Sequence, residues 1–292
     1  MDWLFFAEVS LAGLATGGLY ALIALGFVII YKATRVINFA IGEIMMFAAY
    51  LFLSFAGGMQ LPPLIALPLA VLGGTILGGV VEKVMIRPML GESPISVVMV
   101  TIGLASILVG MAEIIWTADP QLLPEFLPRD PVFLGEIYLA PKIAYGFLIG
   151  ATVLVLYLLY FRFSRGGVAL RATASDQAAA YSMGINVRRV FNLAWVFGSL
   201  AASLAGILVS ATGGLSPQSG AIGLSVLVIV IVGGLDSILG ALIAGLFVGW
   251  LETVAGAFFG GEYRMLATFS VLALILIIRP YGLFGTHEIE RL

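Results

Sequence analysis

The chain contains 292 residues, of which 61% are hydrophobic and only 10% are charged, whereas soluble domains carry about 25% charged residues. This composition excludes a soluble enzyme. The absence of cysteine and the single histidine, His287, further exclude thiolate and most imidazole chemistry, so we expect no catalytic or metal-binding residues. The formal net charge of -2 excludes the basic surface that a nucleic-acid partner requires.

Nine apolar segments follow one another along the chain, and a helix needs roughly 20 such residues to cross a bilayer. The expected spans are residues 9–31, 36–56, 64–81, 95–117, 143–161, 190–212, 222–234, 238–258 and 265–278. The segment 222–234 is short, so we expect a broken or re-entrant helix there. The apolar runs are continuous rather than alternating, which predicts an all-α fold. We expect one domain, residues 1–292, built as a polytopic membrane helix bundle of 8 or 9 spans.

Basic residues predict the orientation of the bundle, because positively charged loops stay in the cytoplasm. They follow the first, third and fifth spans, as Lys32, Arg35, Lys83, Arg87, Arg162, Arg165, Arg171, Arg188 and Arg189. Residues 118–142 instead carry four acidic residues and five prolines, which are typical of an irregular external loop. We therefore expect an outer N-terminus, an external loop at 118–142 and a cytoplasmic loop at 162–189. Nine crossings would also place Arg279 and Arg291 inside, whereas eight would not. The first three residues lack the basic region of a signal peptide, so we expect the first span to be retained.

Glycines recur at helical spacing in three of the expected spans, for example at Gly13 and Gly17 in the first and at Gly245 and Gly249 in the eighth. Small residues allow helix backbones to approach closely within a membrane, which predicts a tightly packed bundle. A pathway lined by small residues is the second interpretation, and both can hold together.

Ionisable residues within the apolar segments are costly and usually face protein or water. Glu43, which follows Asn38 in the second span, is the most interior of them. It is either a carboxylate at a helix end or in a helix pair, or part of a solute pathway. We expect Glu8, Glu113 and Glu252 to lie near the membrane surface, and Asp236 to cap the following helix.

The inner loop contains an alanine-rich stretch, residues 167–183, that predicts a short surface helix ended by Gly184. A simple connection between spans needs only a few residues. The extra helix therefore indicates either a docking surface for a soluble partner or a basic stretch that lies on membrane lipid.

Four blocks of sequence share a family pattern in the same order along the chain. The first runs from YALIALG at 20–26 to INFA and GE at 37–43, and the others are 171–190, GGLDS with GA at 233–241, and RPYGLFG at 279–285. Together they resemble the LivH-like permease subunits of branched-chain amino acid ABC transporters, over nearly the whole chain. Ile41 departs from the pattern, since a histidine is common at this position.

The resemblance implies a set of partners. These are a second related permease subunit, two cytoplasmic ATP-binding subunits that hold ATP and magnesium, and an extracytoplasmic solute-binding protein. The chain has no GxxxxGK[ST] phosphate loop of its own. The resemblance also implies that the inner helix couples to the ATP-binding subunits, through Arg171, Asp176, Ala179, Tyr181 and Gly184. Ala178 stands where the coupling segment of such importers usually has an acidic residue.

A polar solute is poorly soluble in hydrocarbon, so an importer must provide a protein-lined route. We expect this route between the two permease subunits, with inward-open and outward-open states alternating. The predicted lining residues are Thr16, Gly17, Tyr20, Asn38, Glu43, Gly233, Gly234 and Ser237.

Three other functions compete with this hypothesis. Urea and short-chain amide permeases share the same blocks. A secondary transporter would need paired ionisable residues and matched broken helices in two inverted halves, of which only a faint similarity near Gly42 and Gly240 is present. An intramembrane enzyme would need a nucleophile with a base nearby, and Ser10, Ser199 and Ser203 have no histidine within the expected spans.

Overall fold

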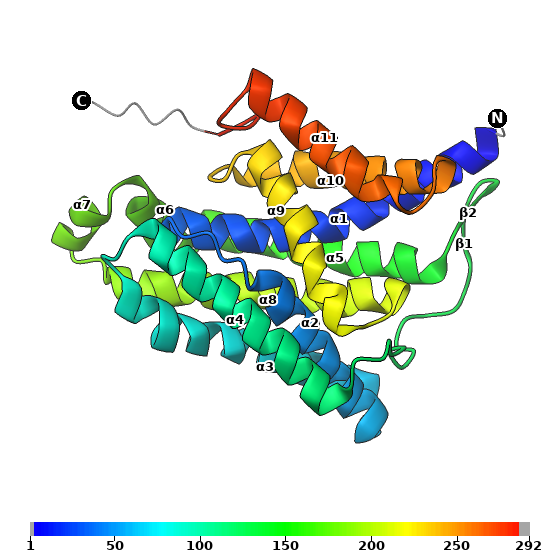
Figure 1. The fold of residues 1–292 in the computed structure, drawn as a ribbon, viewed down its shortest axis with the longest axis horizontal. Coiled ribbons are helices and arrows are strands. Elements are labelled where there is room, and N and C mark those ends of the chain that lie inside the picture. Colours follow the sequence, from blue (N-terminus) through cyan, green and yellow to red (C-terminus); the bar gives the residue numbers. More distant parts are fainter. Residues whose placement is uncertain (1–2, 286–292) are drawn as a thin grey trace.

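The computed structural model describes residues 3–285, so His287 and Arg291 lie outside the described residues. The described part is an almost entirely helical bundle (Figure 1). Its helices are α1 (Trp3–Thr34), α2 (Ile41–Phe52), α3 (Pro63–Val81), α4 (Pro94–Trp116), α5 (Pro141–Phe163), α6 (Arg165–Ser175), α7 (Gln177–Ser182), α8 (Val187–Gly213), α9 (Ile222–Gly233), α10 (Ile238–Phe258) and α11 (Tyr263–Ile278). Two short strands, β1 (Val132–Leu134) and β2 (Ile137–Leu139), form one antiparallel hairpin.

Within residues 3–285, seven helical stretches are long and apolar enough to cross a membrane: α1, Ile41–Gly58, Pro63–Met89, α4, α5, α8 and α10. Two shorter apolar stretches, Pro217–Gly233 and α11, occupy the remaining expected spans. The prediction of an all-α polytopic bundle is therefore confirmed. The expected short helix near 222–234 is also confirmed, because α9 has 12 residues and follows a 3-10 turn, Pro217–Ala221.

The helix α1 forms the centre of the bundle and packs against α5, α8, α9 and α10. Gly17 shows why this packing requires glycine. A Cβ atom at this position would lie 2.7 Å from the backbone oxygen of Gly245 and 2.8 Å from the Cα atom of Leu246 on α10. The predicted role of the first-span and eighth-span glycines in close helix packing is thus confirmed.

The second span differs from its prediction. We expected a helix from residue 36, whereas α2 begins at Ile41. The reason is that Arg35 adopts a φ of 56°, which ends α1, and residues 36–40 are not helical. Figure 1 shows this connection running back along the bundle, so that α2 begins in its interior.

The two ends of the bundle carry different structures. The start of α1 and the β hairpin lie at one end, and α6 and α7 lie at the other (Figure 1). The hairpin is tied to α1 by a hydrogen bond from the Tyr138 backbone N–H to Glu8 Oε1, at 3.1 Å. We expected one surface helix over 167–183, but α6 and α7 are separate. They are interrupted by Asp176, whose carboxylate accepts hydrogen bonds from the backbone N–H groups of Ala178 (2.8 Å) and Ala179 (2.9 Å).

Candidate functional site

The helices α2 and α9 both begin inside the bundle, and their first turns touch. A Cβ atom on Gly42 would lie 3.0 Å from the Cα atom of Gly223, and a Cβ atom on Gly223 would lie 2.9 Å from the Cα atom of Gly42. Each helix follows a segment that is not α-helical. These segments are residues 35–40 before α2 and the turn at 214–221 before α9. Only glycine fits at this contact, which we call the α2–α9 crossing. Irregular backbone of this kind is tolerated within a membrane when it is buried in protein or lines a cavity.

Two polar residues, Asn38 and Glu43, lie on either side of Gly42 in the chain at the α2–α9 crossing. The Asn38 side chain is fully buried, and its Oδ1 atom accepts a hydrogen bond from the Ala40 backbone N–H at 3.0 Å. Glu43 is half-buried, and a Cβ atom on Gly220 would lie 3.0 Å from its Oε1 atom. The Nδ2 atom of Asn38 and the Oε2 atom of Glu43 are buried without a hydrogen-bond partner among residues 3–285. Buried polar atoms without partners are costly, and within apolar bundles such residues mark functional sites.

The connection to α2 is also held from α4. The Oγ1 atom of Thr101, which is fully buried, accepts a hydrogen bond from the Phe39 backbone N–H at 3.3 Å and donates one to the Val98 carbonyl at 2.8 Å. The crossing therefore joins α2, α4 and the turn before α9. Sequence reasoning missed Thr101, Gly220 and Gly223. One available signal was the tripeptide Ala-Ile-Gly, which occurs at 40–42 and again at 221–223.

The three predicted pathway residues of the first span lie away from the crossing, on the part of α1 that packs against α10. The Thr16 hydroxyl bonds a carbonyl of its own helix at 3.0 Å, and Gly17 is buried against the α10 backbone. Tyr20 lies beside Glu252, which is buried inside the bundle and accepts a hydrogen bond from the Thr268 hydroxyl at 2.7 Å. Polar side chains of α1, α10 and α11 therefore contact one another here.

Gly233, Gly234 and Ser237 lie at the opposite end of α9. Ten residues of helix, about 15 Å at 1.5 Å each, separate Gly233 from Gly223 at the crossing. The Ser237 hydroxyl caps α10 by accepting a hydrogen bond from the Gly240 N–H at 3.0 Å. Gly234 has a φ of 108°, and the segment after α11 packs against it. The eight predicted pathway residues thus fall in three separate places, and only Asn38 and Glu43 lie beside the α2–α9 crossing.

The predicted coupling residues lie mainly on the exposed side of α6 and α7. Tyr181 is 74% exposed, Asp176 and Ala179 are also exposed, and Gly184 turns the chain after α7 with a φ of 84°. Tyr181 and Gly184 also line a cavity of about 1250 Å³ between α7, the end of α1 and the start of α8. Arg171 has an additional contact, since its guanidinium donates to the Phe161 carbonyl at the end of α5. The exposed surface of α7, defined by Asp176, Ala179 and Tyr181, is hereafter the α7 surface.

One contact links the α7 surface to the centre of the bundle. The Nε2 atom of Gln177 donates a hydrogen bond to the Ala33 carbonyl in the last turn of α1, at 3.3 Å. The helix α6 also packs against α1. Because α1 leads directly into residues 35–40, α7 contacts the chain a few residues before the crossing.

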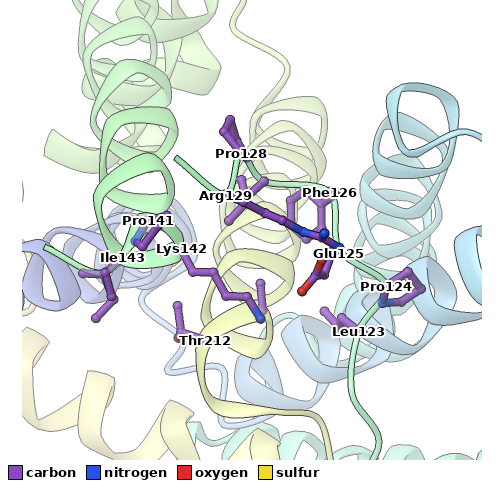
Figure 2. Close-up of a pocket in the computed structure, with 13 residues that line it drawn as sticks. Leu123, Pro124, Glu125, Phe126, Pro128, Arg129, Pro141, Lys142, Ile143 and Thr212 are labelled. Carbon is purple, nitrogen blue, oxygen red and sulfur yellow. Dashed lines mark ion pairs between the residues drawn. The ribbon is translucent and has the colours of Figure 1, made fainter. Parts of the chain in front are cut away.

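A second cavity, of about 310 Å³, lies at the end of the bundle that carries the β hairpin. Residues 123–129, the start of α5 and the end of α8 line it. Figure 2 shows Lys142 extending across this outer pocket, with Glu125 and Arg129, which form an ion pair, on the loop opposite. The remaining lining is mostly apolar, with Leu123 and Phe126 among its residues. Sequence reasoning predicted the external loop but not this pocket.

An apolar helix bundle with two broken helices and polar groups at their crossing defines a polytopic membrane protein of the transport class. The family model for the branched-chain amino acid transport system permease component matches residues 9–279, so the chain belongs to this family. The resemblance inferred from the four sequence blocks is confirmed, and the chain is a multi-pass permease component of the branched-chain amino acid ABC transporter family.

Curated relatives match over nearly their full length. The high-affinity branched-chain amino acid permease LivH of Salmonella typhimurium is 28% identical, with 99% of both chains covered. BraD of Pseudomonas aeruginosa is 30% identical, with 96% of this chain and 95% of the relative covered. Among solved structures, PsaBC from Streptococcus pneumoniae in complex with Fab has a TM-score of 0.53, with 92% and 91% of the two chains covered. At 13% identity, this last similarity concerns the fold alone.

Proposed function

We propose that this chain is one membrane half of an ATP-driven importer that moves branched-chain amino acids by alternating access. The observation that carries the proposal is the α2–α9 crossing. There the amide nitrogen of Asn38 and one carboxylate oxygen of Glu43 are buried without a hydrogen-bond partner among residues 3–285. A zwitterionic amino acid loses its hydration in hydrocarbon and needs replacement hydrogen bonds. Asn38 and Glu43 offer a donor and an acceptor of this kind next to the largely apolar surroundings that an aliphatic side chain prefers.

A second membrane subunit would complete the pathway. The exposed face of α4 supports this proposal because it carries Gly103, Ser106, Gly110 and Glu113 along one side of the helix. A Cβ atom on either glycine would meet nothing within 4 Å. Small residues suit close packing against another helix, and the Glu113 carboxylate in the last turn of α4 can accept a hydrogen bond from a partner. We call these four residues the α4 stripe, and we assign it to the contact with the second permease subunit.

The energy would come from two cytoplasmic ATP-binding subunits that bind ATP and magnesium and dock on the α7 surface. Three observations support docking on the α7 surface: the exposure of Tyr181, the adjoining cavity and the hydrogen bond from Gln177 to the end of α1. ATP binding changes the equilibrium between two states only if the partner contacts them differently. The contact between α7 and α1 offers a route for that difference to the crossing.

At the opposite end, an extracytoplasmic solute-binding protein would dock over residues 118–142 and the outer pocket. This arrangement places the N-terminus outside and the chain in the cytoplasmic membrane, in agreement with the distribution of arginines. Cysteines introduced at Asp130 and Ser175 test the orientation. We expect them to be labelled from the outer and inner sides, respectively, and labelling from one side would contradict it.

Uptake of labelled leucine into proteoliposomes that contain the complete transporter tests the function itself. We expect uptake to require ATP and the binding protein. Glu43→Gln and Asn38→Leu should each lower uptake by roughly tenfold or more, equivalent to the loss of one or more hydrogen bonds to the solute. The control is Glu262→Gln, an exposed carboxylate in the turn between α10 and α11.

Three results would contradict the proposal. Uptake without ATP would favour a secondary transporter, and full uptake by both crossing variants would remove the crossing from the pathway. Uptake of urea in place of leucine would identify an amide permease, although the names of the curated relatives favour branched-chain amino acids.

A further inference from the structure

A third cavity, of about 480 Å³, opens at the same end of the bundle as α6 and α7. It lies where the segment after α3 meets the first two turns of α8. Its polar lining includes three arginines, Arg87 from the segment after α3 and Arg188 and Arg189 from the first turn of α8. Three guanidinium groups from two separate chain segments therefore surround one hollow, which we call the arginine pocket.

The charge of the arginine pocket is not balanced within residues 3–285. Among these residues, the ion pair of an arginine in the lining is that of Arg87 with Glu82, whose side chain is 1% exposed. Both of its oxygens are occupied by Arg87, at 3.1 and 2.8 Å, and Asn192 donates a further hydrogen bond at 2.7 Å. Arg188 and Arg189 are exposed and form no ion pair within residues 3–285. The pocket thus retains two positive charges that an anion can satisfy.

The lining changes from polar to apolar along α8. Leu193, Val196 and Phe197 follow the arginines by one to two turns on the same helix and complete the pocket. All three are partly exposed, so each offers apolar surface within the hollow. A free phosphate would use only the arginines and leave this apolar surface in water. A phospholipid has the matching order of groups, with a phosphate followed by acyl chains.

We propose that the arginine pocket binds an anionic phospholipid of the inner leaflet, with its phosphate between Arg188 and Arg189 and an acyl chain along Leu193, Val196 and Phe197. Basic pockets between membrane helices on the cytoplasmic side are suited to such headgroups. The assignment to the inner leaflet rests on the orientation given under the proposed function. Binding itself does not depend on transport.

Lipid retention by the purified, complete transporter tests the proposal. Native mass spectrometry would compare the wild type with Arg188→Gln/Arg189→Gln after incubation with phosphatidylglycerol or phosphatidylcholine. The matched control is Arg162→Gln/Arg165→Gln, which removes two exposed charges from the same end of the bundle but outside the pocket. We expect phosphatidylglycerol to remain bound to the wild type and the control, and to fall at least fivefold in the pocket variant.

Several outcomes would overturn the proposal. Equal loss of phosphatidylglycerol in both double variants would show general charge attraction, and equal retention of both lipids would remove the role of the anionic headgroup. Displacement of the lipid by millimolar inorganic phosphate or pyrophosphate would identify a soluble phosphate as the ligand. Failure of leucine uptake with lipid retention intact would contradict only the proposed function. Size-exclusion profiles of all variants check that the chain is folded.

Discussion

The helices α4 and α5 are alike in length and position but differ in the surface that they expose. Each has 23 residues and begins with a proline. Each lies at the periphery, because only 28% of the most apolar stretch of α4 and 17% of that of α5 is buried. The exposed face of α5 carries large apolar side chains, among them Leu148, Val155, Leu156 and Leu159. That of α4 carries large apolar side chains as well, among them Ile107 and Ile114, but it also includes the two glycines, the serine and the carboxylate of the α4 stripe.

This difference shows that a side chain exposed in an isolated membrane chain contacts either lipid or a partner subunit. Lipid tails pack well against leucine and valine, so α5 is already covered in a bilayer. Glycine leaves a groove, and the Glu113 carboxylate in the last turn of the span needs water, lipid headgroups or a protein partner. A face with both features suits close packing against another protein helix. On its buried side α4 also holds the connection to the crossing through Thr101, so it joins the proposed partner to the proposed pathway.

The largest expected effect comes from filling the groove on α4. Gly103→Leu/Gly110→Leu should reduce co-purification of the second permease subunit by roughly tenfold or more, because bulky side chains hold the helices apart. The chain itself should fold normally, since a Cβ atom at either position meets nothing within 4 Å. The control is Thr152→Leu/Val155→Leu on the exposed face of α5. Normal assembly of the α4 variant would refute its role as the partner contact.

Removing the carboxylate of the α4 stripe should have a smaller effect. Glu113→Leu removes a group that we expect to be hydrogen-bonded to the partner, with a loss of about 1 to 1.4 kcal/mol and a reduction in co-purification of roughly five- to tenfold. Glu92→Leu, which removes an exposed carboxylate before α4, is the matched control. If Glu113→Leu instead increases assembly, the carboxylate faces lipid headgroups rather than the partner.

Much of the fold was predictable because long apolar segments have few alternatives within a membrane. The helix α10 has the predicted bounds, Ile238–Phe258, and most other spans differ by a few residues. The start of α2 was not predictable in this way, because residues 36–40 are as apolar as a helix would be. What ends α1 is the backbone of Arg35, and hydropathy contains no information on a single φ angle. The break between α6 and α7 at Asp176 was not predictable either. A polar residue in an alanine-rich stretch is typical of a helix surface, and its capping hydrogen bonds are visible only in the structure.

The candidate site was predictable to the extent that its residues are exceptions to an apolar pattern. Asn38 and Glu43 stand out in this way, and both lie beside Gly42 of the crossing. The partners of Gly42 lie about 180 residues away along the chain and depend on long-range packing. Gly233 and Gly234 appeared to mark a break within the membrane. Their surroundings instead accommodate the segment after α11, where the Leu283 backbone N–H donates to the Val232 carbonyl at 2.8 Å and that of Phe284 to the Gly233 carbonyl at 3.1 Å.

The buried sides of α4 and α5 allow a more selective comparison. Thr101 on α4 accepts a hydrogen bond from Phe39, and Tyr157 on α5 donates one to the Phe197 carbonyl at 2.8 Å. Thr101→Val and Tyr157→Phe should each cost about 1 kcal/mol of stability, measured by denaturation in detergent, because each removes one hydrogen bond. Only Thr101→Val should lower leucine uptake, roughly threefold, because only Thr101 supports the crossing. Equal losses of uptake would show that the effect is one of stability alone.

The smallest expected effect compares two exposed side chains of similar size. Leu156 on α5 is 58% exposed and Ile107 on α4 is 55% exposed, so truncation to alanine removes a comparable apolar surface from each helix. Leu156→Ala exchanges contacts with lipid for other contacts with lipid and should change co-purification by less than about 1.5-fold. Ile107→Ala removes packing beside the α4 stripe and should reduce co-purification by roughly two- to threefold, about 0.5 kcal/mol. Titrating the second permease subunit against each variant in nanodiscs resolves effects of this size. Indistinguishable binding curves would place Ile107 against lipid and confine the partner contact to the stripe itself.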